Sequence, residues 1–477
     1  MATASRRWWA LGLIALAQFM VIMDTSIIGV ALPRMQGDLG FTPGNLSWVF
    51  NAYVVAFGGL LLLGGRLSDL FGARRVFTAG WAVLLAGSLA AGLADDVAVE
   101  LTARAVQGAG AALIAPSALT LLMMLFGAEA KELTKALALY GAAAPAGGTA
   151  GVFLGGVITE YVSWPWVFYV NIPIAVLVLA AIPAVMPAGG ARRGSLDLLG
   201  ALTVTAGLAA AVYAIVRAPE IGWASAQTWL VLGAAVLALG VFVAIQATRR
   251  EPLVRLSIFR APDLAAANVA QLLLGAAWIP MWFYLNLYLQ QVLGYSAFPS
   301  GAALLPMTVL IMLGMILLAP RAIGRFGPKA TLVAGLTVLA AGLGWLAFVR
   351  PTGSFVADVL PASLVAALGM SLAFIPSLGT AIGAARPEEG GLAAGIVNTS
   401  YQVGSALGLA AMTAVAAAAG GDQLGNLPAL TDGYSAAFTG AAVIALAGAV
   451  LAALTLRPAP SAPAAAAEPE QQTAARV

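Results

Sequence analysis

The chain has 477 residues, of which 61% are hydrophobic and only 9% are charged, and its formal net charge is +3. A soluble protein carries about 25% charged residues, whereas the apolar residues here come in repeated blocks of about 20 or more, which indicates membrane helices. The basic residues are dispersed along the chain, so no nucleic-acid-binding surface is expected. The absence of Cys and His excludes disulfides and thiolate metal sites and leaves carboxylates to carry any proton chemistry near neutral pH.

Hydropathy predicts fourteen helices that cross the membrane. The first is interpreted as an uncleaved span rather than a signal peptide, because its apolar stretch runs past about 20 residues and lacks a small-x-small cleavage site. The tail, residues 458–477, is rich in Ala, Pro and Glu and is expected to be disordered. The predicted spans are residues 8–32, 46–65, 76–94, 99–124, 134–158, 167–186, 197–216, 228–247, 264–292, 299–320, 329–349, 357–384, 391–419 and 434–456.

The distribution of basic residues tests this count through the positive-inside rule. With a cytoplasmic N-terminus, most of the 23 Lys and Arg residues fall in loops or tails on the cytoplasmic side. Only Arg34, Arg217 and Arg350 fall outside, and Arg104 lies within a span. A wrong helix count would mix the two sets. We therefore expect a multi-pass protein of the cell membrane with both termini in the cytoplasm.

Two short basic segments, "GRLSDLFGAR" at 65–74 and "PRAIGRFGPK" at 320–329, share a pattern. If six-helix halves are the repeating unit, the domains are an N-terminal bundle at 1–190, two inserted helices at 191–255 and a C-terminal bundle at 256–457. Two parallel halves are a transporter architecture with a substrate site between them. Coincidence between two tight basic turns is the alternative. The matched pairs are Arg66 with Arg321, Phe71 with Phe326, Gly72 with Gly327, and Arg74 with Lys329.

Six motifs occur in order: "MDTSIIGVALP", "GRLSDLFGARR", "RAVQGAGAALIAPS", "GGTAGVFLGG", "SWPWVFYVNIP" and "GLAAGIVNTSYQVGSALG". They resemble the major facilitator superfamily, and within it the fourteen-span drug:proton antiporters of the multidrug or antibiotic efflux type. The resemblance implies an all-α integral membrane protein with the major-facilitator fold, two six-helix halves and two inserted helices. It also implies transport driven by the proton motive force, without a cofactor. The chain departs from the family pattern at Leu70, Ala73, Val152 and Tyr401.

Asp24 and Arg104 are the charged residues that lie deepest in the predicted spans. Asp24 lies about 24 Å from the inner end of the first span, and Arg104 lies about 8 Å from the outer end of the fourth. In a hydrocarbon core about 30 Å thick these depths are similar, and unpaired charge there is costly, so a pair is expected. An aspartate held between desolvation and a nearby Arg can change protonation as the cavity opens to either face. We predict a proton-coupling pair; a static ion pair or a local backbone cap is the alternative.

The loop after the second span is predicted to act as a conformational latch. Asp69 and Arg74 could lock the two halves in one state through charge contacts with cytoplasmic helix ends. A solvated loop that only sets topology would explain the arginines, but it would not explain Gly65 and Gly72, which suggest a fixed turn.

The fifth span carries Gly147, Gly151 and Gly155 four residues apart, followed by Gly156. The first three lie on one helix face, which lets a neighbouring helix approach closely. The resemblance implies that this antiporter-motif face meets a helix of the other half and seals the cavity. Ordinary tight packing is the alternative.

Polar and aromatic side chains in three spans are predicted to line the substrate cavity. A cavity with aromatic walls and a few amides suits bulky, largely apolar ligands, although Trp and Tyr also anchor helices at membrane interfaces. The predicted cavity residues are Asn51, Tyr53, Trp278, Trp282, Asn286, Asn398 and Gln402.

The favoured function is a secondary active transporter that exports hydrophobic drugs or secondary metabolites in exchange for protons. Its expected partners are a small hydrophobic or amphipathic substrate, protons and membrane lipid, and we expect a monomer. A carrier for one specific native solute is the alternative. A membrane enzyme is disfavoured because the sequence has no nucleophile–base set, no metal-ligand cluster and no Walker loop. A channel or scaffold is disfavoured by the repeated halves and the glycine-lined helices.

Overall fold

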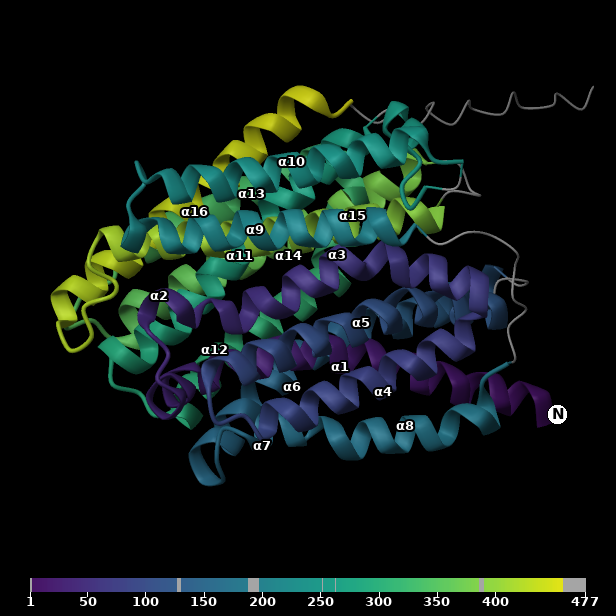
Figure 1. The fold of residues 1–477 in the computed structure, drawn as a ribbon, viewed down its shortest axis with the longest axis horizontal. Coiled ribbons are helices and arrows are strands. Elements are labelled where there is room, and N and C mark those ends of the chain that lie inside the picture. Colours follow the sequence, from purple (N-terminus) through teal and green to yellow (C-terminus); the bar gives the residue numbers. More distant parts are fainter. Residues whose placement is uncertain are drawn as a thin grey trace, which may run out of the picture.

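The computed structural model describes residues 2–126, 130–187, 197–250, 252–261, 263–385 and 390–457, and most of these residues are helical (Figure 1). The long helices run roughly along one axis of the molecule. Short π-helical turns follow α11 and α12 and precede α14, and a 3₁₀ turn precedes α11. The α-helices are α1 (Ala2–Leu39), α2 (Pro43–Leu46), α3 (Trp48–Phe71), α4 (Ala73–Gly92), α5 (Val97–Phe126), α6 (Ala130–Tyr161), α7 (Trp166–Tyr169), α8 (Asn171–Val185), α9 (Leu198–Ile221), α10 (Ala226–Thr248), α11 (Leu264–Leu287), α12 (Ala297–Leu313), α13 (Ala319–Leu346), α14 (Leu360–Ala384), α15 (Gly390–Ala418) and α16 (Leu427–Thr455).

Among the described residues, thirteen helical segments are long and apolar enough to cross a membrane. One of them, Ala297–Leu346, has 50 residues. A straight helix of that length would measure about 75 Å, more than twice the hydrocarbon core of about 30 Å. This segment joins α12 to α13, and its helical geometry is broken at Gly327, where φ is 82° and ψ is 164°. The chain is therefore an all-helical, multi-pass membrane protein.

The helices before α9 and those after α10 repeat one pattern of contacts. In the first helical group, α1–α8, α1 packs on α6, α3 packs on α5, and α4 packs on α5 and α8. In the second helical group, α11–α16, α11 packs on α15, α12 packs on α14, and α13 packs on α14 and α16. The matched glycines Gly72 and Gly327 have φ values of 89° and 82°, which residues with a side chain rarely adopt. The repeat seen in the sequence thus extends to the backbone and to helix packing.

The pair α9 and α10 lies between the two groups in the sequence and contacts both through α9. α9 packs against α3 of the first group and α15 of the second, while α10 packs against α9 (Figure 1). Asp197, the N-cap of α9, accepts hydrogen bonds from Gly200 N at 2.9 Å and Gln246 Nε2 at 2.7 Å. Since Gln246 belongs to α10, this buried carboxylate fixes α9 and α10 to each other.

The two groups meet along α1, α3 and α6 of the first and α11, α12 and α15 of the second. One hydrophobic cluster is continuous across this boundary and includes Ile27 of α1 and Met281 and Trp282 of α11. The predicted disordered tail at 458–477 and the boundary predicted near residue 190 lie outside the described residues.

Candidate functional site

Asp24 lies on α1 and is almost completely buried, with 1% of its surface exposed. Its Oδ2 accepts a hydrogen bond from Arg104 Nη1 at 2.7 Å. Its Oδ1 accepts from Asn171 Nδ2 at 2.7 Å and from Gln107 Nε2 at 3.2 Å. The contact predicted between Asp24 and Arg104 is present, and helices α1, α5 and α8 converge on one carboxylate.

Arg104 is fully buried on α5. Its Nε donates to Val49 O at 3.1 Å and its Nη1 also donates to Gln107 Oε1 at 2.7 Å. The guanidinium carbon lies 4.6 Å from the ring centroid of Tyr53 and 5.8 Å from that of Phe168, within the range of cation–π attraction. Tyr53, predicted to line the substrate cavity, lies under the Arg104 guanidinium and is fully buried.

We call Asp24, Arg104 and the polar side chains that contact them, together with Ser88, the charge cluster. Three of its polar members, Ser88, Gln107 and Asn171, were not predicted from the sequence. Ser88 Oγ on α4 accepts from Gln107 Nε2 at 2.8 Å and from Asn171 Nδ2 at 3.1 Å. A serine hydroxyl thus holds the two amides that orient Asp24. Two features of the sequence could have indicated them. Gln107 lies one turn after Arg104 on the same helix, and Asn171 places an amide in an apolar segment.

Asp24 accepts three hydrogen bonds, one of them from a guanidinium. Protonation of Asp24 would remove the charge that Arg104 neutralises, and a buried cation without a partner is costly. Among the described residues, no group of three His, Cys, Asp or Glu side chains could hold a metal ion.

The glycine face of α6 packs against α1, next to Asp24. A Cβ atom at Gly147 would lie 2.3 Å from Phe19 O, one at Gly151 2.8 Å from Met23 O, and one at Gly155 2.7 Å from Ile27 O. The expectation that this face meets the other half is wrong for these three glycines, because their partner belongs to the first group. Their partner is α1, the helix that carries Asp24. The following residue, Gly156, does face the second group: its Cβ would lie 3.0 Å from Ala297 O on α12.

The loop predicted to be a latch forms contacts within its own helical group. Gly72 joins α3 to α4 with a positive φ, and Arg74 Nη1 donates to Met186 O, at the end of α8, at 3.4 Å. Lys329, the match of Arg74, donates to Leu456 O, at the end of α16, at 2.6 Å. The expected contact with a helix end is thus present for Arg74, but the helix belongs to the same half.

Gly65, also part of the predicted latch, lies within the first group. Gly65 faces α5, where its Cβ would lie 3.8 Å from Pro116. The side chain of Asp69 lies outside the described part of the chain.

Three of the remaining predicted cavity residues, Trp282, Asn286 and Gln402, lie at the boundary between the groups, where they approach glycines of α1 and α3. Trp282 packs edge-on to Phe50 at 5.8 Å between ring centroids, and a Cβ at Gly29 would lie 2.1 Å from its ring. Asn286 Nδ2 bonds to Trp282 O at 2.8 Å. Asn51 and Trp278 are buried, Gln402 is half-buried and Asn398 is exposed.

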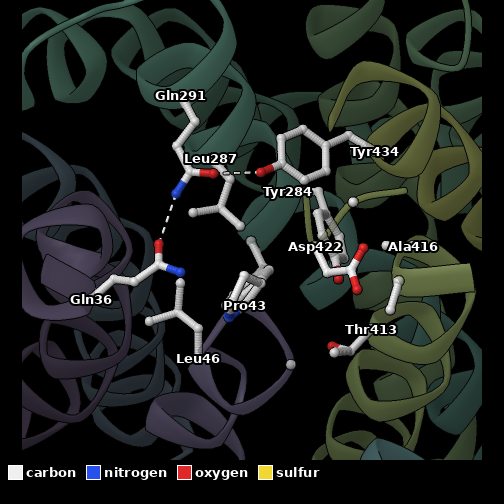
Figure 2. Close-up of a pocket in the computed structure, with 14 residues that line it drawn as sticks. Gln36, Pro43, Leu46, Tyr284, Leu287, Gln291, Thr413, Ala416, Asp422 and Tyr434 are labelled. Carbon is white, nitrogen blue, oxygen red and sulfur yellow. Dashed lines mark hydrogen bonds between the residues drawn. The ribbon is translucent and has the colours of Figure 1, made fainter. Parts of the chain in front are cut away.

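The two groups are joined by side-chain amides at the end of the bundle where α1 finishes, which we call the far end. Gln290 Nε2 donates to Val30 O at 3.0 Å, and Gln291 Nε2 donates to Gln36 Oε1 at 2.9 Å. Tyr434 donates to Gln291 Oε1 at 2.6 Å. Figure 2 shows Gln36 and Gln291 facing each other beside a pocket lined by both groups, and none of the predicted cavity residues lines that pocket.

Replacing Gln291 with Leu should loosen the far end, since it removes the hydrogen bond to Gln36 that crosses between the groups, which contributes about 1 kcal/mol. The measurement uses Val30→Cys as a reporter, because Val30 is fully buried and the chain has no Cys of its own. In detergent solution, the maleimide labelling rate should rise about fivefold, the effect of about 1 kcal/mol. Gln227→Leu, at an exposed position of α10, is the control. An unchanged labelling rate in Gln291→Leu would show that the hydrogen bond between Gln291 and Gln36 does not hold the groups together.

With this geometry in place, comparison with known proteins decides the family. The sequence model of the Major Facilitator Superfamily matches residues 14–409. The chain belongs to the major facilitator superfamily. The cephamycin export protein CmcT of Amycolatopsis lactamdurans is 39% identical over 446 residues, covering 93% of this chain and 91% of that protein. The puromycin resistance protein pur8 of Streptomyces alboniger is 38% identical over 466 residues, covering 94% and 91%.

The major-facilitator fold is also found by structural comparison. The crystal structure of a bacterial homologue of the human lysosomal transporter Spinster, inward-facing and unoccupied, matches with a TM-score of 0.66 and 14% identity. The match covers 94% of this chain and 97% of that one. At 14% identity it is evidence for a shared fold and not for a shared substrate. As a major-facilitator protein, the chain is a transporter rather than an enzyme, and it needs no cofactor because ion gradients drive transport in this superfamily.

Proposed function

We propose that this major-facilitator protein exports hydrophobic drugs or secondary metabolites in exchange for protons. The observation that carries the proposal is the buried ion pair between Asp24 and Arg104, 2.7 Å apart, inside the helical bundle. Buried charged residues in membrane helices are costly and mark ion or proton pathways. The two relatives support the direction and the cargo, since one is named as a cephamycin export protein and the other as a puromycin resistance protein.

Proton binding to Asp24 would act on the contact between the two groups. Arg104 keeps its bonds to Val49 O and Gln107 when Asp24 is neutralised, so it stays with α5 while its bond to α1 weakens. α1 also packs against α11 and α12 of the second group. A change in how α1 sits on α5 is therefore passed directly to the boundary that must open and close. Ligand and proton each bias this two-state equilibrium through their different affinities for the two states.

The proposed topology has fourteen crossings. It follows if the 50-residue segment Ala297–Leu346 turns back at Gly327 and crosses twice. The halves are then residues 1–190 and 256–457, with the inserted pair at 191–255, as a monomer in the lipid of the cell membrane. Both termini and the basic loops at Arg74 and Lys329 would face the cytoplasm, in agreement with the positive-inside rule.

The substrate site is proposed to lie between the groups, where α3, α11 and α15 meet. Asn51 supports this placement, because both polar atoms of its buried side chain have no hydrogen-bond partner among the described residues. Trp282 and Gln402 come from the second group. Gln402 lies close to α3, since a Cβ added at Gly58 would stand 3.0 Å from the Cβ of Gln402. Aromatic surface with few amides suits a hydrophobic or amphipathic substrate.

A carrier for one native solute is the second candidate. Its support is that both relatives are named after one antibiotic each, cephamycin and puromycin, rather than after several drugs.

The basic residues at the two matched turns are proposed to stiffen each half. Arg74 ties α4 to the end of α8, and Lys329 ties α13 to the end of α16. A cation at a helix C-terminus is favourable by about 0.3–1 kcal/mol. Each half would then move as one body, so that closure occurs at the boundary between them.

Expression in a host without its own drug pumps tests the proposed function. Cells that make the protein should accumulate less puromycin and less ethidium than control cells, and a protonophore should abolish the difference, because the proton gradient supplies the free energy. Reduced accumulation of only one compound would favour the single-solute carrier. Reduced accumulation that persists with the protonophore would contradict proton coupling.

A further inference from the structure

Glu100 lies in the first turn of α5 and is fully buried, although it has an ionisable side chain. Neither of its carboxylate oxygens has a hydrogen-bond partner among the described residues. This arrangement is the opposite of that at Asp24, where both oxygens accept hydrogen bonds.

Arg104 follows Glu100 by four residues on α5, and side chains with this spacing are neighbours on a helix surface. The Nη2 group of Arg104 has no hydrogen-bond partner in the described part of the chain. The charged groups that act on Glu100 are Arg104 from its own helix and Asp24 from α1. Tyr53, on α3, is the other titratable side chain of the cluster, and its ring packs under Arg104.

One guanidinium thus interacts electrostatically with two buried carboxyl groups, and it is hydrogen-bonded to only one of them, Asp24. Burying a carboxylate without hydrogen bonds costs so much free energy that such a group takes up a proton instead. Asp24 has the donors that hold a negative charge, whereas Glu100 has none. In the conformation described, the charges balance if Asp24 is ionised and Glu100 carries a proton.

We propose that Glu100 is a second proton-binding residue that exchanges a proton with Asp24 around Arg104. In the exchange, the proton of Glu100 passes to Asp24: the O–H bond of Glu100 breaks, the O–H bond of Asp24 forms, and the Nη2 group of Arg104 becomes the donor to Glu100. Arg104 remains protonated throughout and changes only its partner. The exchange deepens the proposed function and rests on it, since it gives Arg104 a counter-ion in both states of the transport cycle.

Infrared difference spectroscopy of the purified protein, recorded while the pH is changed, tests the exchange without substrate or gradient. The wild-type protein should show the C=O stretching band of a buried carboxylic acid at neutral pH. Glu100→Gln should lose this band, and Glu100→Asp should keep it at a shifted frequency. Asp24→Asn should also lose it, because Arg104 then pairs with an ionised Glu100.

Asp95→Asn, at an exposed carboxyl just before α5, is the control and should leave the band unchanged. An identical band in the wild-type protein and in Glu100→Gln would overturn the proposal. So would a band that persists in Asp24→Asn, since Arg104 would not have changed partner. Should Glu100→Gln fail to fold, an unshifted band in Glu100→Asp overturns the assignment and a shifted one supports it. A failure of proton-coupled export would leave these bands as predicted, so the two proposals fail separately.

Discussion

Asp24→Asn is expected to abolish uphill export while leaving substrate binding intact. Asn keeps the size of Asp24, and its oxygen can still accept hydrogen bonds from Asn171 and Gln107, so the protein should fold with the helix packing of the neutral form of Asp24. It cannot gain or lose a proton, so export is no longer linked to the proton gradient. In proteoliposomes, the puromycin enrichment driven by an imposed proton gradient should fall by about tenfold or more, a typical size for a coupling free energy.

The control for this prediction is Asp38→Asn on the same helix. Asp38 is exposed and accepts a hydrogen bond from Trp164 Nε1 at 2.8 Å. The carbonyl oxygen of Asn can accept the same hydrogen bond. Exchange of labelled puromycin without a gradient should be retained by both variants. Loss of exchange and of binding in Asp24→Asn would instead indicate that Asp24 is only a structural ion pair.

Gly147→Ala is expected to destabilise the protein and to reduce export, because a methyl group there would lie 2.3 Å from the backbone oxygen of Phe19. Neither backbone can move without separating α6 from α1, and overpacking of this kind costs about 1–3 kcal/mol. The shift of α1 would also disturb Asp24, which lies further along the same helix. Thermal unfolding in detergent and puromycin export should therefore both be impaired.

Gly148→Ala is a matched control one residue away. Its added methyl group would lie 3.8 Å from the nearest side-chain atoms, which is ordinary van der Waals contact. It should unfold at the wild-type temperature and keep wild-type export. Equal effects of the two substitutions would mean that helix propensity matters here and that the close approach of α6 to α1 does not.

Much of the fold was predictable because insertion into a membrane depends on long apolar runs, which hydropathy records directly. Helix ends were less predictable: α1 extends to Leu39, beyond the apolar run that suggested residue 32. The break near Gly327 was predicted from the sequence, which gave separate spans at 299–320 and 329–349, whereas in the structure the helical segment runs from Ala297 to Leu346 with non-helical geometry only at Gly327. Apolarity cannot tell which helices become neighbours, because every helix in a membrane protein is apolar.

The charge cluster was predictable in part. Asp24 and Arg104 could be paired from their depths, since a charge in hydrocarbon demands a partner. Ser88 and Asn171 could not be found in this way, because neutral polar residues can satisfy their hydrogen bonds in many places. The glycines of α6 showed that a helix comes close but could not show which helix, and the partner inferred from the family resemblance was wrong for Gly147. A basic residue such as Arg74 likewise predicts a negative partner without identifying it.

Proton movement evoked by substrate is the most direct test of the central claim that Asp24 couples protons to export. Sealed proteoliposomes containing a trapped pH-sensitive dye are mixed with puromycin, without any imposed gradient. The wild-type protein should give a saturable pH change as protons and puromycin cross in opposite directions, and Asp24→Asn should give none while still exchanging puromycin. Puromycin transport by the wild-type protein without any proton movement, or an undiminished pH change in Asp24→Asn, would contradict the account.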